Sequence, residues 1–119
     1  MNKIYDELIA KGAVEPVQAT PYEIGWHLKD IDVVLEWLKE KNHVVLGGDI
    51  LNKNKEHTYD NWYYEYDNNI SLLDNVEKGV AKAREYTSWY AKKFGFDYFV
   101  VVVSADAEKL IELFGASIF

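Results

Sequence analysis

The chain has 119 residues and a net charge of −7, from 20 acidic and 13 basic side chains that are spread over both halves. Its length suits a single domain, and a hydrophobic content of 49% excludes a disordered or low-complexity chain. The absence of cysteine excludes disulfide bonds, thiolate metal sites and cysteine nucleophiles. An acidic chain of this kind repels nucleic acid and anionic membranes. Its charge either attracts a basic protein or serves solubility alone.

The sequence predicts a cytoplasmic protein. Residues 1–7 include acidic side chains where a secretory signal would have an apolar run. The longest uninterrupted apolar stretch, residues 98–103, is too short to span a bilayer.

The first third of the chain predicts two helices. Residues 3–11 form a short helix that ends at Gly12. Residues 12–28 hold both prolines and show no sustained period, so we expect an irregular connection with a short extended piece at residues 24–28. Residues 30–41 form the second helix, with apolar residues at helical spacing at Ile31, Val34, Leu35 and Leu38.

A β-hairpin is expected next. Residues 43–51 read as a strand that Gly47 and Gly48 interrupt or end. Residues 52–56 form a polar turn, and residues 57–66 form the returning strand.

The remaining elements are a long helix, a strand and a short helix. Ser71 with Asp74 resembles a capping box, and the helix that follows runs to about Phe94. Residues 97–104 form a strand without alternation, which favours burial on both faces and a central or parallel position. Residues 105–114 form the last helix. The inward positions predicted for the long helix are Leu73, Val76, Val80, Ala83, Thr87, Tyr90 and Phe94.

These elements predict an α+β fold in one domain over residues 1–119. The expected order is ααββαβα, with about four helices packed on a three-stranded sheet. The long helix is long enough for a crossover, so the sheet is either antiparallel or mixed.

The segment Tyr59-Asp60-Asn61-Trp62-Tyr63 is the most unusual stretch, because Asp and Asn are disfavoured in strands. Aromatic rings with polar groups, next to a carboxylate, are typical of protein-recognition surfaces. Asp60 either pairs with a basic group of a partner or is held inside by hydrogen bonds, whereas a buried structural role is favoured for Asn61. We expect a partner-binding surface at Asp49, Tyr59, Asp60, Trp62 and Glu65, and a structural role for Gly47, Gly48, Asn61 and Tyr63.

No catalytic pattern competes with this segment. His27, His43 and His57 lack the spacing of metal ligands, and no serine has the context of a nucleophile. The sequence therefore predicts a protein that is not an enzyme and has no metal and no cofactor.

Three segments resemble immunity protein 40 of bacterial polymorphic toxin systems. They are Leu46-Gly47-Gly48-Asp49, Tyr59-Asp60-Asn61-Trp62-Tyr63 and Ala83-Arg84-Glu85-Tyr86. The residues around Trp26-His27-Leu28 and Leu35-Glu36-Trp37-Leu38 are compatible with the same family, and the resemblance covers residues 26–103.

The resemblance implies a protein that binds and neutralises a cognate toxin domain. The acidic charge favours a basic toxin, of which a nuclease is one candidate. We expect a monomer or weak dimer. The alternative is a small-ligand binding module with an aromatic-lined cleft.

Overall fold

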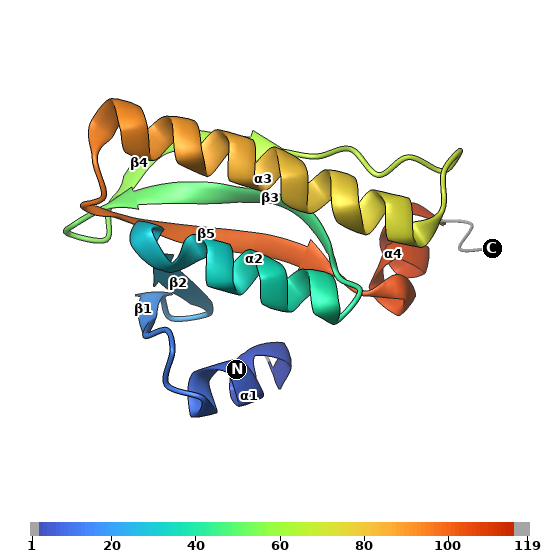
Figure 1. Ribbon diagram of the computed structural model, residues 1–119, viewed down its shortest axis with the longest axis horizontal. Helices are drawn as coiled ribbons and strands as arrows, with labels where there is room; N and C mark the ends of the chain where they lie inside the picture. The colour runs from blue at the N-terminus through green and yellow to red at the C-terminus, as the bar shows by residue number, and fades with distance from the viewer. Residues whose placement is uncertain (1–2, 116–119) are drawn as a thin grey trace.

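The computed structural model describes residues 3–115 (Figure 1). Along the chain its elements are η1 (Lys3–Tyr5), α1 (Asp6–Ala10), β1 (Pro16–Thr20), β2 (Glu23–His27), η2 (Leu28–Asp30), α2 (Ile31–Glu40), β3 (Val44–Asn52), β4 (His57–Tyr63), α3 (Leu72–Phe94), β5 (Tyr98–Ala105) and α4 (Ala107–Phe114).

The sheet has five strands in the order β1-β2-β5-β3-β4, and each pairing is antiparallel. The predicted α+β class is confirmed, but the predicted three-stranded sheet is wrong. The two additional strands, β1 and β2, form a hairpin within residues 12–28, where we expected an irregular connection. The extended piece expected at residues 24–28 corresponds to β2, whereas β1 was not expected. Pro21 lies in the turn of this hairpin, where its fixed φ favours a turn, and Pro16 begins an edge strand, where no partner needs its N–H.

The central position predicted for β5 is confirmed, because β5 pairs with β2 on one side and β3 on the other. β5 points in the same direction as β4, as a crossover through α3 allows. However, β3 lies between these two strands and runs opposite to both. The mixed sheet that the sequence left open is therefore wrong, and all ladders are antiparallel.

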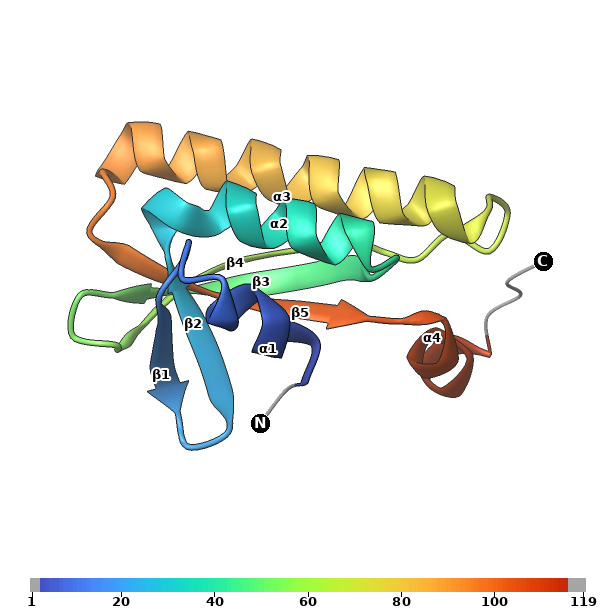
Figure 2. The ribbon, with the colours of Figure 1, turned by 60° about the horizontal axis from the view of Figure 1, so that its bottom comes forward.

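Helices α2 and α3 lie side by side on one face of the sheet (Figure 2). Arg84 of α3 joins them, because its guanidinium lies 2.6 Å from Glu36 Oε2 and 3.5 Å from Asp32 Oδ1 of α2. The largest fully buried side chains of the core are Trp26, Tyr90, Leu35, Leu38, Ile50 and Leu51.

The ends of α3 follow the prediction. The Ser71 hydroxyl accepts a hydrogen bond from the Asp74 N–H (3.0 Å), and Gly95 follows the helix with φ of 90°. Two inward assignments are wrong, because Leu73 is 60% exposed and Phe94 is 45% exposed. Within residues 3–115, no helix combines the length and apolar character needed to cross a membrane.

Candidate functional site

Alternate residues of β4 connect this strand to α3. Asp60 Oδ2 accepts a hydrogen bond from the Tyr90 hydroxyl (2.8 Å). The next residue on this side, Trp62, is 6% exposed and stacks on Tyr86 with ring centroids 5.3 Å apart. These two residues of the predicted contact surface therefore hold the strand against the helix.

The third residue of this row, Tyr64, meets a polar side chain inside the protein. Its hydroxyl donates to Asn75 Oδ1 (2.6 Å), which also accepts from the Asp67 N–H (2.9 Å). The Asn75 amide donates to the carbonyls of Asp67 and Ser71, each at 3.0 Å. Asn75 thus fixes the path of the chain between β4 and α3, a role that our sequence analysis missed.

A bulge in β4 interrupts its pairing with β3. Asp49 pairs with Asn61 and Leu51 with His57, so three residues of β4 oppose Ile50 alone. Within the bulge, the Thr58 hydroxyl donates to the Ile50 carbonyl (2.9 Å) and accepts from the Asp60 N–H (3.1 Å).

Tyr59 lies at the centre of this bulge, with a φ of 68° and a side chain that is 88% exposed. A left-handed conformation at a bulky residue is strained, and such strain is concentrated at functional positions.

Two glycines let β4 and β5 lie close to β3. A Cβ atom on Gly47 would lie 2.5 Å from the Trp62 carbonyl oxygen, and Gly47 has a φ of 156°. A Cβ atom on Gly48 would collide with the Trp62 indole and would lie 2.7 Å from the Val101 carbonyl oxygen. Both positions therefore require glycine.

The remaining members of the predicted site lie on the other side of β4. Asp49 pairs across the ladder with Asn61, and Gly47 with Tyr63, on the face that is turned away from α2 and α3. Asn61 is exposed, so the buried role that we favoured for it is wrong, and Tyr63 is 67% exposed. Glu65 is exposed just beyond the strand and lines a hollow together with Tyr63.

A groove of about 810 Å³ runs between β4 and α3. Trp89 of α3 lines this groove, but the sequence does not connect it to β4, because the packing of strand against helix is not visible in local periodicity. The groove is lined by Trp62, Tyr64, Lys78, Ala81, Lys82, Glu85, Tyr86 and Trp89.

Burial and charge act on the hydroxyls beside this groove. Burial, aided by the hydrogen bond donated to Asp60, raises the pKa of Tyr90 to about 12. Burial also raises the pKa of Tyr86, and the Asp60 carboxylate adds to this effect. Both hydroxyls are therefore neutral donors at neutral pH.

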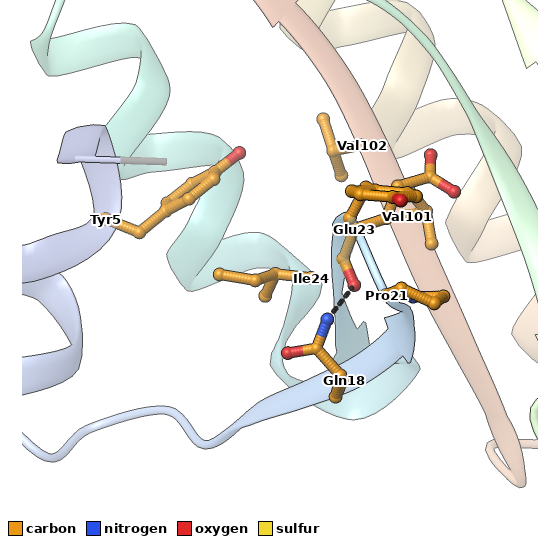
Figure 3. A pocket seen from close by; sticks show the side chains of 8 residues that line it. Tyr5, Gln18, Pro21, Glu23, Ile24, Val101 and Val102 are labelled. Carbon is orange, nitrogen blue, oxygen red and sulfur yellow. Dashed lines mark hydrogen bonds between the residues drawn. The ribbon is translucent and has the colours of Figure 1, made fainter. Parts of the chain in front are cut away.

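A second cavity, of about 340 Å³, lies where the β1–β2 hairpin separates from β5 (Figure 3). Tyr5, Ile24 and Val102 point into it, and Gln18 donates a hydrogen bond to the Glu23 carbonyl (3.4 Å) at its edge. Burial raises the pKa of Tyr5 to about 12, so its hydroxyl stays protonated at neutral pH.

The histidines lie apart from one another. His43 Nδ1 is 3.1 Å from the Ser104 hydroxyl, whereas the His27 and His57 rings contact Phe99 and Tyr59. Burial lowers the pKa of His43, although Asp106 acts in the opposite direction. Among residues 3–115, no three His, Asp or Glu side chains are grouped to hold a metal ion.

The fold and site define a small α+β protein in which an exposed aromatic edge strand is fixed to a long helix. The family model of immunity protein 40 matches residues 15–104, and the chain belongs to this family. Comparisons with curated proteins and with solved structures gave no match.

Proposed function

We propose that this protein binds and neutralises a cognate bacterial toxin domain in the cytoplasm. Membership of the immunity protein 40 family supports this proposal, because the family takes its name from that role. The protein acts by binding as a monomer or weak dimer, without a cofactor.

The exposed part of β4 is the proposed contact surface. Tyr59 and Tyr63 are large exposed aromatics, and Asp49 and Glu65 lie near them. Aromatic residues supply much of the binding energy of protein interfaces, and acidic side chains speed the capture of a basic toxin. Asp60 and Trp62 support the surface from the helix side, because both are held by residues of α3.

Calorimetric titration of the toxin domain encoded immediately upstream, together with growth rescue on co-expression, tests the proposal. We expect tight one-to-one binding that abolishes toxicity. Tyr59→Gly suits the left-handed backbone at this position, so it removes the ring without straining the fold. We expect it to weaken binding by about tenfold or more.

Glu65→Lys reverses a charge of the proposed surface, and Glu15→Lys makes the same change at an exposed residue before β1. We expect only Glu65→Lys to weaken binding. If Tyr59→Gly and Glu65→Lys both fold and bind as tightly as the wild-type protein, the contact surface does not lie on β4.

A second candidate function is a small-ligand binding module, which the aromatic groove between β4 and α3 favours. It predicts that an aromatic ligand, such as a nucleoside, raises the melting temperature in the absence of any protein partner. A panel of nucleosides and aromatic amino acids that leaves the melting temperature unchanged would argue against it.

A further inference from the structure

We propose that the groove between β4 and α3 receives an extended, acidic segment of the toxin, which pairs with β4 as a sixth strand. This inference rests on the proposed function and adds the mode of binding. This β4–α3 groove is the one lined by Trp62, Tyr86 and Trp89.

The backbone of β4 has a free side at this groove. The Tyr64 N–H donates to the Leu46 carbonyl (2.8 Å), so Tyr64 directs its N–H toward β3. Neighbouring residues of a strand direct their peptide groups to opposite sides, so Tyr63 and Asn61 direct theirs to the outer edge. In the described part of the chain, no strand pairs with this edge.

Residues of the groove would cover one face of an added strand. It is bordered by Trp62 of β4, by Tyr64 just after this strand, and by residues of α3 from Lys78 to Trp89. A strand paired with β4 lies about 4.8 Å from it. Its side chains on the α3 side would therefore rest against Tyr86 and Trp89 instead of water.

The α3 side of the groove carries two lysines, Lys78 and Lys82, against one carboxylate, Glu85, and this excess of positive charge favours an acidic segment. Lys78 and Lys82 lie one helical turn apart, where like charges repel. Neither has an ion-pair partner within residues 3–115, although the protein as a whole carries a charge of −7. The Lys82 ammonium lies 5.7 Å from the centre of the Tyr63 ring, beside the free edge. Carboxylates of an incoming strand would relieve the repulsion between the two lysines.

The indole of Trp62 gives a second indication. Its Nε1–H is buried and has no acceptor among the described residues. Buried donors nearly always have a partner in folded proteins. Trp62 borders the groove, so a small shift of its ring on binding would bring this donor within reach of an oxygen atom of the added segment.

A second copy of this chain fits the groove less well. Pairing of two β4 strands about a two-fold axis would bring Lys78 and Lys82 of both copies to one gap. The repulsion would add to that between two proteins that each carry a charge of −7. In addition, the bulge at Thr58–Asp60 limits pairing to the residues from Asn61 onward, which favours a short added segment.

The test distinguishes the contribution of the Tyr63 N–H to binding from that of the Tyr63 ring. Tyr63→Pro removes the outward N–H, whereas Tyr63→Ala removes the ring and keeps the N–H. Lys82→Glu reverses a charge in the groove, and Lys29→Glu makes the same change at an exposed lysine between β2 and α2. Each variant, after a folding check by circular dichroism, is titrated with the toxin domain encoded immediately upstream.

We expect Tyr63→Pro to bind about tenfold more weakly than Tyr63→Ala, and Lys82→Glu about tenfold more weakly than Lys29→Glu. Hydrogen exchange at the Asn61 and Tyr63 amides should slow in the complex. Because Lys82→Glu leaves the strand backbone intact, the charge comparison holds even if Tyr63→Pro does not fold.

The outcomes that overturn the inference are distinct. If the wild-type protein binds the toxin domain, and the groove variants equal their controls, the added strand is wrong and the proposed function stands. If the wild-type protein does not bind, both fail. If sedimentation shows a dimer that Lys82→Glu strengthens by relieving the lysine repulsion, the groove belongs to a second copy and the toxin segment is overturned.

Discussion

Asn75 shows how one side chain fixes a segment that has no regular structure. It is fully buried, and its amide takes part in four hydrogen bonds that fix Tyr64, Asp67 and Ser71. Three of these hydrogen bonds join α3 to Tyr64 and Asp67 in the connection from β4, and the fourth lies within the start of α3. The start of α3 is therefore positioned relative to β4, and with it the β4–α3 groove.

At the residue scale, the sequence singled out the segment Tyr59–Tyr63 but not the contacts that each of its members makes. The alternation in Tyr59-Asp60-Asn61-Trp62-Tyr63 correctly separates two sides of a strand. It does not reveal that α3 covers the side of Asp60 and Trp62, because the partners Tyr90 and Tyr86 are distant in sequence. The left-handed Tyr59 follows from the bulge, which depends on the register with β3.

His43 makes stability dependent on pH. Burial lowers its pKa in the folded protein below the ordinary value of 6.5, so the unfolded chain binds a proton more readily. His43 therefore costs no stability above about pH 6.5, where it is neutral in both states. As the pH falls through that value, the free energy of unfolding decreases. Urea unfolding of the wild-type protein and His43→Gln between about pH 7.5 and 5.5 checks this. We expect a shallower pH dependence in the variant, and equal slopes would contradict it.

At the scale of elements, α3 lies directly against β3 at Gly79. A Cβ atom at this position would lie 2.7 Å from the Val45 carbonyl oxygen and 3.2 Å from its nitrogen. These are backbone atoms of a residue that pairs with Ser104 of the central strand β5, so they have little freedom to move. The distance between helix and sheet, and hence the depth of the groove, depends on this glycine.

Gly79→Ala therefore shows which effect on stability is larger, the gain in helix propensity or the loss of packing against β3. Alanine favours an isolated helix by about 1 kcal/mol, but here we expect a loss of about 1 to 3 kcal/mol in the free energy of unfolding. Lys78→Ala, at the adjacent exposed position, is the matched control and should have little effect on stability. Urea denaturation measures both, and a Gly79→Ala variant as stable as the wild-type protein would mean that the helix shifts to accommodate the methyl group.

The elements themselves were predictable where the periodicity was strong. The helices α2 and α3 and the hairpin β3–β4 lie close to their predicted bounds. The β1–β2 hairpin was missed because Pro16, Pro21 and Gly25 suggest loop structure, and most of its side chains are only half-buried. The hairpin depends on pairing with β5, which local sequence does not encode.

At the scale of the whole molecule, a charge of −7 creates a field that extends beyond any single contact. If the toxin domain is basic, we expect its association rate constant to fall steeply as sodium chloride is raised, with a smaller change in dissociation. Stopped-flow measurement at several salt concentrations checks this. An association rate that does not depend on salt would show that long-range attraction has no part in capture.

The middle place of β5 in the sheet has a consequence during synthesis. This strand leaves the ribosome after β1, β2, β3 and β4, yet it lies between β2 and β3. Until Tyr98–Ala105 has emerged, the two halves of the sheet have no common neighbour, and the core around Val100 stays open. A nascent chain without the fifth strand therefore cannot complete the sheet, and a message cut short before this strand yields no complete fold.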